Sequence, residues 1–178
     1  MRGIKTITIS ILAVGLLAGS AVGVVAQDEE AADGATSFTG NSRESLYVSD
    51  PPPVATPDGM DVGTEWVIQL RWVTTDPRLT GQATATTNWV VDEGEDGFTY
   101  LGAHTYELSN DGGSWLGSGT HLANPLGVNG NAVLVGQDGY DGLTAYIVFV
   151  DNDAGHNDMI GTIIPIAMPE APEPYAAE

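Results

Sequence analysis

The sequence predicts an all-β protein in which a single antiparallel meander of about eight short strands closes into a small β-barrel. A two-sheet sandwich is the alternative. Apolar and polar residues alternate in short runs, the turns between them are rich in glycine and aspartate, and no long stretch beyond the N-terminus has a helical period. Glycines inside the runs favour the barrel, because they let a sheet bend tightly enough to close. These glycines are Gly81, Gly102, Gly117 and Gly119.

Residues 1–26 have the pattern of a secretory signal helix. Arg2 and Lys5 form a basic start, Ile7 to Leu17 is an apolar run, and Val24-Val25-Ala26 offers small residues for cleavage. A retained membrane anchor is the alternative, but small polar residues interrupt the apolar run and a cleavage site follows it. We therefore expect a secreted, extracellular protein that has no stable membrane insertion once the signal is removed.

Residues 27–60 are expected to form an acidic leader and a proline-rich segment. The leader is acidic and alanine-rich and shows no period, as is typical of a disordered segment. Residues 36–40 are a candidate short strand. Pro51-Pro52-Pro53 and Pro57-Asp58-Gly59 are incompatible with a central strand, so residues 41–59 are expected to form a long surface connection or a partly extended arm.

The segment Thr64 to Thr74 has the clearest strand pattern in the chain, because its two faces differ in character. One face is apolar throughout and consists of Trp66, Ile68, Leu70 and Trp72. The other carries Glu65, Val67, Gln69, Arg71 and Val73. Such alternation predicts a half-buried strand, and the face that points inward decides whether the interior is apolar or polar.

Further strands follow at short spacing. The turn Thr75-Asp76-Pro77-Arg78 precedes them, and in it Asp76 and Arg78 are expected to pair or to cap backbone groups. The expected strands are 79–91, 98–108, 114–122, 131–136, 143–150 and 159–167. We therefore expect one barrel domain over residues 61–167, followed by a disordered proline-rich tail over residues 168–178.

Composition limits the classes of partner. The chain has no cysteine, so burial and hydrogen bonds alone must stabilise an exported domain. The formal net charge is -19, and loss of Arg2 and Lys5 with the signal lowers it by two, to -21. An acidic surface of this kind repels phosphate backbones, which argues against nucleic acid as a partner.

Three motifs together resemble a pattern in secreted bacterial β-barrel proteins of unassigned activity. The motifs are Thr75-Asp76-Pro77-Arg78-Leu79-Thr80-Gly81, Asn110-Asp111-Gly112-Gly113-Ser114-Trp115-Leu116-Gly117 and Gly136-Gln137-Asp138-Gly139-Tyr140-Asp141-Gly142-Leu143-Thr144. The resemblance spans Phe38 to Ile164 and implies no established chemistry. More distantly, the strand-rich chain with its glycine-aromatic-glycine turn is similar to the small barrels of the allene oxide cyclase and dirigent type. That likeness implies an eight-stranded barrel that holds an apolar ligand. No catalytic residue of those enzymes can be matched to a position in this sequence.

Four residues are candidates for ligand binding: Arg71, His104, Tyr106 and His121. His104 and His121 fall in adjacent expected strands, so their imidazoles can meet across the sheet if both face a cavity. A lone interior histidine is more commonly just a hydrogen-bonded residue, and no His-x-His spacing supports a metal site. Arg71 projects into the interior only if the polar face of its strand points inward, and the alternative is a buried or rim ion pair with an acid.

The acidic loop from Asp151 to Asp158 is a candidate calcium site. Carboxylates at Asp151, Asp153 and Asp158 can converge on a hard cation. The loop lacks the glycine and the bidentate glutamate of an EF-hand and is flanked by strands, so a solvated hairpin loop without any cofactor is the favoured alternative.

These candidates define three functions. Binding of a small apolar or amphipathic ligand without chemistry ranks first. A structural or adhesive extracellular module with calcium-binding acidic loops ranks second, and a cyclase- or isomerase-type enzyme using His104, Tyr106 or Arg71 ranks third. No nucleophile elbow, phosphate loop or zinc-protease helix is present, and the sequence assigns neither a catalytic residue nor an oligomeric state.

Overall fold

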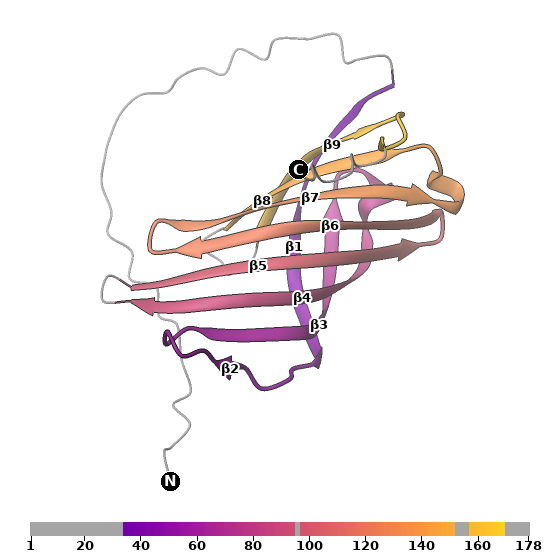
Figure 1. The fold of residues 1–178 in the computed structure, drawn as a ribbon. Helices are drawn as coiled ribbons and strands as arrows, with labels where there is room; N and C mark the ends of the chain where they lie inside the picture. The colour runs from indigo at the N-terminus through magenta and orange to yellow at the C-terminus, as the bar shows by residue number, and fades with distance from the viewer. Residues whose placement is uncertain (1–33, 95–96, 152–156, 170–178) are drawn as a thin grey trace, which may run out of the picture.

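The computed structural model of the chain describes residues 34–94, 97–151 and 157–169, and most of these lie in antiparallel strands (Figure 1). The strands are β1 (Thr36–Ser49), β2 (Val54–Ala55), β3 (Asp61–Thr74), β4 (Gly81–Gly94), β5 (Gly97–Asn110), β6 (Gly113–Asn124), β7 (Gly127–Gln137), β8 (Thr144–Asp151) and β9 (Asn157–Ile164). Two short 3-10 turns, η1 (Pro77–Leu79) and η2 (Asp138–Tyr140), interrupt them. No helix in this part of the chain is long and apolar enough to cross a membrane. The expected signal, residues 1–26, lies outside the described residues.

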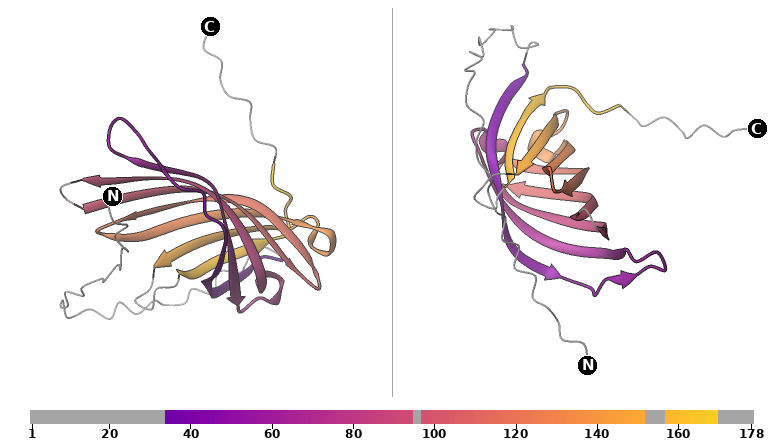
Figure 2. Two further views of the ribbon diagram at one scale, coloured as in Figure 1. Left: turned by 90° about the horizontal axis from the view of Figure 1, so that it is seen from below. Right: turned by 90° about the vertical axis from the view of Figure 1, so that its left-hand side faces the viewer.

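The strands form one sheet that closes on itself. Their order is β1-β9-β8-β7-β6-β5-β4-β3-β2, and β1 also pairs with β3. Eight strands therefore form a ring, while β2 lies beside β3 outside it. Figure 2 shows β1, in indigo, running from alongside β9, in yellow, to alongside β3. The prediction of an all-β antiparallel meander that closes is confirmed.

The ring is irregular where β3 meets its neighbours. The register shifts twice between β1 and β3 and once between β3 and β4, from Gly63 to Trp66. At this last bulge Glu65 has a positive φ of 58°, and its backbone N–H donates to Asn88 Oδ1 at 2.9 Å. An extra residue in one strand bends and twists it locally, so the barrel is uneven in cross-section.

β1 is much longer than the short strand expected over residues 36–40. It runs to Ser49, pairing through residues 36–42 with β9 and through residues 40–49 with β3. The prolines at 51–53 follow its last residue, so they end the strand instead of excluding it. The sequence Asn41-Ser42-Arg43-Glu44 after Gly40 hid the strand, because it is polar at successive positions and shows no apolar alternation. The barrel therefore begins at residue 36 and not at residue 61.

The apolar face of β3 points inward. Trp72 is fully buried, and Ile68 and Leu70 are half-buried. Arg71, which lies between Leu70 and Trp72 in the sequence, is exposed. The interior is accordingly lined by apolar and aromatic side chains, as the burial of such surface would favour.

Buried side chains pack together in one half of the interior. The largest of the buried residues there come from β3, β5–β9 and the two 3-10 turns, so the connections β3–β4 and β7–β8 fold over this end. These residues are Trp72, Leu79, Leu108, Trp115, Leu134, Tyr140, Ile147 and Ile163. This half is the hydrophobic core of the molecule.

The side chain of Asn110 forms hydrogen bonds that connect the turns at the filled end of the barrel. Its Nδ2 donates to the carbonyls of Pro77, Arg78 and Thr80 at 3.3, 3.1 and 3.1 Å. Its Oδ1 accepts from the hydroxyl of Tyr140 at 2.6 Å. One side chain thereby joins all three of the sequence motifs, which are far apart along the chain.

Two further contacts hold the same end. Trp115 Nε1 donates to the carbonyl of Arg78 at 2.8 Å, and its indole stacks on Tyr140 with ring centroids 5.3 Å apart. Asp76 caps η1 and pairs with Arg78 at 2.6 Å, which confirms the structural role expected for this pair. The hydrogen bond from Arg78 lowers the pKa of the Asp76 carboxyl.

Candidate functional site

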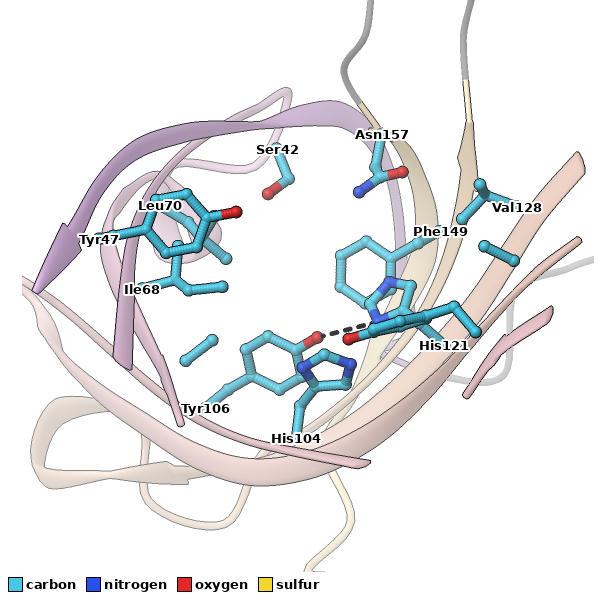
Figure 3. Close-up of a pocket in the computed structure, with 13 residues that line it drawn as sticks. Ser42, Tyr47, Ile68, Leu70, His104, Tyr106, His121, Val128, Phe149 and Asn157 are labelled. Carbon is cyan, nitrogen blue, oxygen red and sulfur yellow. Dashed lines mark hydrogen bonds between the residues drawn. The ribbon is translucent and has the colours of Figure 1, made fainter. Parts of the chain in front are cut away.

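The other half of the barrel holds an open cavity of about 240 Å³ (Figure 3). Every strand of the ring contributes to its wall. The lining residues are Ser42, Tyr47, Ile68, Leu70, Ala85, Tyr100, His104, Tyr106, His121, Ala123, Val128, Phe149 and Asn157. None of these is an acid, a lysine or an arginine, so the wall is aromatic and aliphatic with a few neutral polar groups.

Strand alternation brings Tyr100, His104 and Tyr106 of β5 to one side of the cavity. Successive residues of a strand point to opposite faces, so these positions share the inward face with Gly102. A β-carbon on Gly102 would lie 2.5 Å from the Tyr100 hydroxyl oxygen and 2.7 Å from His104 Nε2, closer than contact permits. The missing side chain therefore provides the space over which Tyr100 and His104 fold.

His121 reaches the same cavity from β6. It is opposite Gly130 of β7, and a β-carbon on that glycine would overlap the imidazole ring. The ring therefore lies flat over the glycine backbone. Its other side contacts Phe149, with ring centroids 5.0 Å apart.

The two imidazoles contact each other. Their ring centroids are 4.7 Å apart and their planes are nearly perpendicular, at 88°. His104 Nδ1 lies 2.7 Å from the hydroxyl of Thr87, which is directly opposite it on β4. His121 Nδ1 lies 3.5 Å from the hydroxyl of Tyr106, as the dashed line in Figure 3 marks.

Burial keeps these groups uncharged. Desolvation, together with the smaller effect of the nearby His121, lowers the pKa of His104 to about 4. Desolvation lowers the pKa of His121 to about 4. Desolvation also raises the pKa of Tyr100 to about 12 and raises that of Tyr106. Near neutral pH all four side chains are therefore neutral.

The second nitrogen of each imidazole is buried without a partner. Within the described residues, neither His104 Nε2 nor His121 Nε2 has a hydrogen-bond partner. A buried polar atom left unpaired costs about 1–3 kcal/mol. Two such atoms on neighbouring rings of one cavity wall indicate that something other than the protein satisfies them.

The structure thus brings three of the four ligand-binding candidates together: His104, Tyr106 and His121. Arg71 is not among them. It lies exposed on the outer face, in a shallow groove shared with Gln82, because its strand buries the apolar side. Ligand binding by the first three residues stays a prediction.

The calcium candidates are placed only in part. Asp151 is the last residue of β8, Asp158 is exposed near the start of β9, and Asp153 lies outside the described residues. Among the described residues there is no group of three or more acidic, histidine or cysteine side chains suited to a metal. Calcium binding by this loop stays a prediction.

Sequence reasoning missed Thr87, Tyr100, Ser42 and Asn157. Tyr100 shares the inward face of β5 with His104, so strand periodicity was sufficient to find it. Thr87 is opposite His104 only through the register of β4 and β5, and Ser42 belongs to the strand that was expected to be a connection. Neither pairing can be read from a single sequence.

An aromatic cluster borders the cavity. Trp66 contacts Tyr47 and Trp89 with ring centroids 6.0 and 4.8 Å apart, and Trp89 contacts Tyr100 at 6.2 Å. Trp66 Nε1 donates to the carbonyl of Pro51 at 2.9 Å, which ties the proline segment to the barrel wall.

The fold and the cavity define this chain as a closed antiparallel β-barrel that is filled at one end and hollow at the other. No protein-family model, curated protein or solved structure matches it.

Proposed function

We propose that this protein binds a small, uncharged, amphipathic ligand in the hollow half of its barrel, without chemistry, in an extracellular setting. The observation that carries this proposal is the pair of buried imidazole nitrogens that lack a partner within an otherwise apolar, aromatic wall. Binding sites for small molecules are concave and mostly apolar, with a few convergent polar groups.

The size of the cavity supports a ligand of modest dimensions. An empty apolar cavity of about 150 Å³ in another protein takes up benzene. The present cavity of about 240 Å³ has room for a single ring with a short substituent.

The protonation states argue against acid–base catalysis as the main role. A general base works best with a pKa near the working pH, whereas His104 and His121 have pKa values of about 4. The cation that a cyclase-type reaction would draw on, Arg71, is on the outer face.

The proposal predicts that filling the cavity abolishes binding. Ala123 lines the cavity, whereas Ala103 of the neighbouring strand is exposed on the outer face. Titration of isotope-labelled protein with ethylbenzene and acetophenone, followed by NMR, should give saturable shifts for backbone amides of β5 and β6. Ala123→Phe should remove these shifts, and the matched variant Ala103→Phe should retain them. If no uncharged single-ring compound binds saturably to the wild-type chain, the proposal is wrong.

A further inference from the structure

Resting on the proposed function, we infer that the ligand carries an uncharged carbonyl or similar acceptor oxygen, held by two N–H donors, His104 Nε2–H and His121 Nε2–H. The inference depends on which nitrogen of each ring carries the proton. That assignment follows from the hydroxyl group that each Nδ1 contacts.

His104 has its proton on Nε2. Thr87 is 1% exposed, and its hydroxyl forms a hydrogen bond of 2.7 Å with His104 Nδ1. A buried hydroxyl that only accepts leaves its own hydrogen unsatisfied, which is costly. Both groups are satisfied if Thr87 donates to an unprotonated Nδ1. In a neutral imidazole the proton then resides on Nε2, which becomes a donor.

The same reasoning applies to His121. Tyr106 is 4% exposed, and its hydroxyl is 3.5 Å from His121 Nδ1. Burial raises the pKa of Tyr106, so the phenol keeps its proton and has it to donate. His121 Nδ1 accepts this long hydrogen bond from the Tyr106 hydroxyl, and its Nε2 carries the ring's own hydrogen.

The two imidazole rings are in contact and line the same cavity. The ring centroids are 4.7 Å apart at 88°, and both Nε2 atoms are buried without a partner among the described residues. Figure 3 shows both rings pointing into the cavity. A carbonyl oxygen has two lone pairs and so can accept from both donors.

The charge of the site favours a neutral acceptor over a carboxylate. No lysine or arginine is among the lining residues, both imidazoles are neutral near pH 7, and the chain has a net charge of -19. Moving an anion from water into such a cavity costs far more than moving a ketone or ester. The aromatic wall accommodates the apolar remainder of the molecule.

The tautomers can be measured without any ligand. Long-range proton–nitrogen NMR spectra of the wild-type chain at pH 7 should show both rings with a protonated Nε2 and an unprotonated Nδ1. Thr87→Val removes the donating hydroxyl and should shift His104 toward the Nδ1–H form, whereas Thr87→Ser should restore the wild-type spectrum. A wild-type spectrum with either ring in the Nδ1–H form would overturn the inference.

Binding provides the second test, using acetophenone, ethylbenzene and benzoate, which share one ring. We expect acetophenone to bind more tightly than ethylbenzene by roughly 3- to 10-fold, since each net hydrogen bond is worth about 0.5–1.5 kcal/mol. His104→Phe and His121→Phe should each reduce this preference while ethylbenzene still binds. Arg71→Ala, on the outer face, is the control and should change neither affinity.

The outcomes separate the two proposals. If ethylbenzene and acetophenone bind equally, the cavity binds ligands but the acceptor assignment fails. If benzoate binds more tightly than acetophenone, the site prefers anions and the inference is wrong. Coordination of Zn²⁺ alone by both Nε2 atoms would also overturn it, because those atoms would then be acceptors. If none of the three compounds binds, both proposals fail together.

Discussion

His104 and His121 are unusual residues for such an acidic chain, because within residues 34–94, 97–151 and 157–169 neither forms a hydrogen bond or an ion pair with a carboxylate. Thr87, Tyr106 and Phe149 surround them instead. The two rings therefore remain neutral where an exposed histidine would begin to take up protons. The function proposed for them depends on this neutrality, since each ring would then offer the cavity one donor and no charge.

This neutrality predicts a pH-dependent stability. Both folded-state pKa values are about 4, below the ordinary histidine value of 6.5. The unfolded chain thus binds protons before the folded chain does, so the stabilisation is present above pH 6.5 and is lost as the pH falls toward 4. Each histidine should contribute on the order of 2 kcal/mol to this loss.

Urea unfolding of the wild-type chain and of a His104→Asn, His121→Asn double variant at pH 7 and pH 4.5 measures the effect. Protonation of the many surface acids is common to both chains and cancels in the comparison. The wild type should lose more stability than the double variant. Equal losses would show that the histidines titrate normally and are not desolvated.

At the scale of single elements, the connections β3–β4, β5–β6 and β7–β8 form one end of the barrel. Asn110 links all three of them through its amide. Local turn geometry explains each motif by itself, but not why an asparagine stands at the start of the β5–β6 turn. The asparagine is explained by tertiary contacts, because the Asn110 side-chain amide forms hydrogen bonds with three backbone carbonyls and with the Tyr140 hydroxyl.

We predict that Asn110→Ala is strongly destabilising. It leaves several backbone carbonyls and the Tyr140 hydroxyl without a partner, at a cost of about 2–4 kcal/mol in the free energy of unfolding. Asn131→Ala changes an exposed asparagine of β7 and is the control, with an expected change within about 0.5 kcal/mol. Chemical denaturation followed by tryptophan fluorescence gives both values. A change at Asn110 as small as that at Asn131 would contradict the role assigned to this end.

Strand periodicity predicted the elements from β3 to β9 well, because each of these has one apolar face and a turn at each end. It also put His104 and His121 in adjacent strands. It failed for β1, whose sequence Asn41-Ser42-Arg43-Glu44 is polar and whose partners are the first and last of the other ring strands. The sequence left open which face of β3 points inward. The burial of Trp72 shows that the apolar face does, so the neighbouring Arg71 lies on the outer face. Register and closure depend on distant partners, so no local pattern contains them.

At the scale of the whole molecule, β1 is the strand that closes the barrel. Without it, the facing edges of β3 and β9 would expose unpaired N–H and C=O groups. A chain that begins at Gly34 keeps every described strand and should be monomeric and unfold cooperatively, like the chain without residues 1–26. A chain that begins at Asp50 lacks β1 and should aggregate or oligomerise.

Size-exclusion chromatography and thermal unfolding of the two truncated chains distinguish these outcomes. A monomeric, cooperatively unfolding chain starting at Asp50 would show that β1 is an accessory strand and that closure is not required.

The closing pairs join residues that are far apart in sequence, such as Thr36 with Ile163. The loop-closure entropy of such pairs is offset only after the intervening strands have formed, so closure is expected to be the last step of folding. The cavity does not exist before that step, because its wall includes Ser42 of β1 and Asn157 of β9. A nascent or partly folded chain therefore has no complete cavity in which a ligand could bind. A ligand that binds only the closed ring adds its binding free energy to closure, and so it slows reopening of the β1–β9 seam.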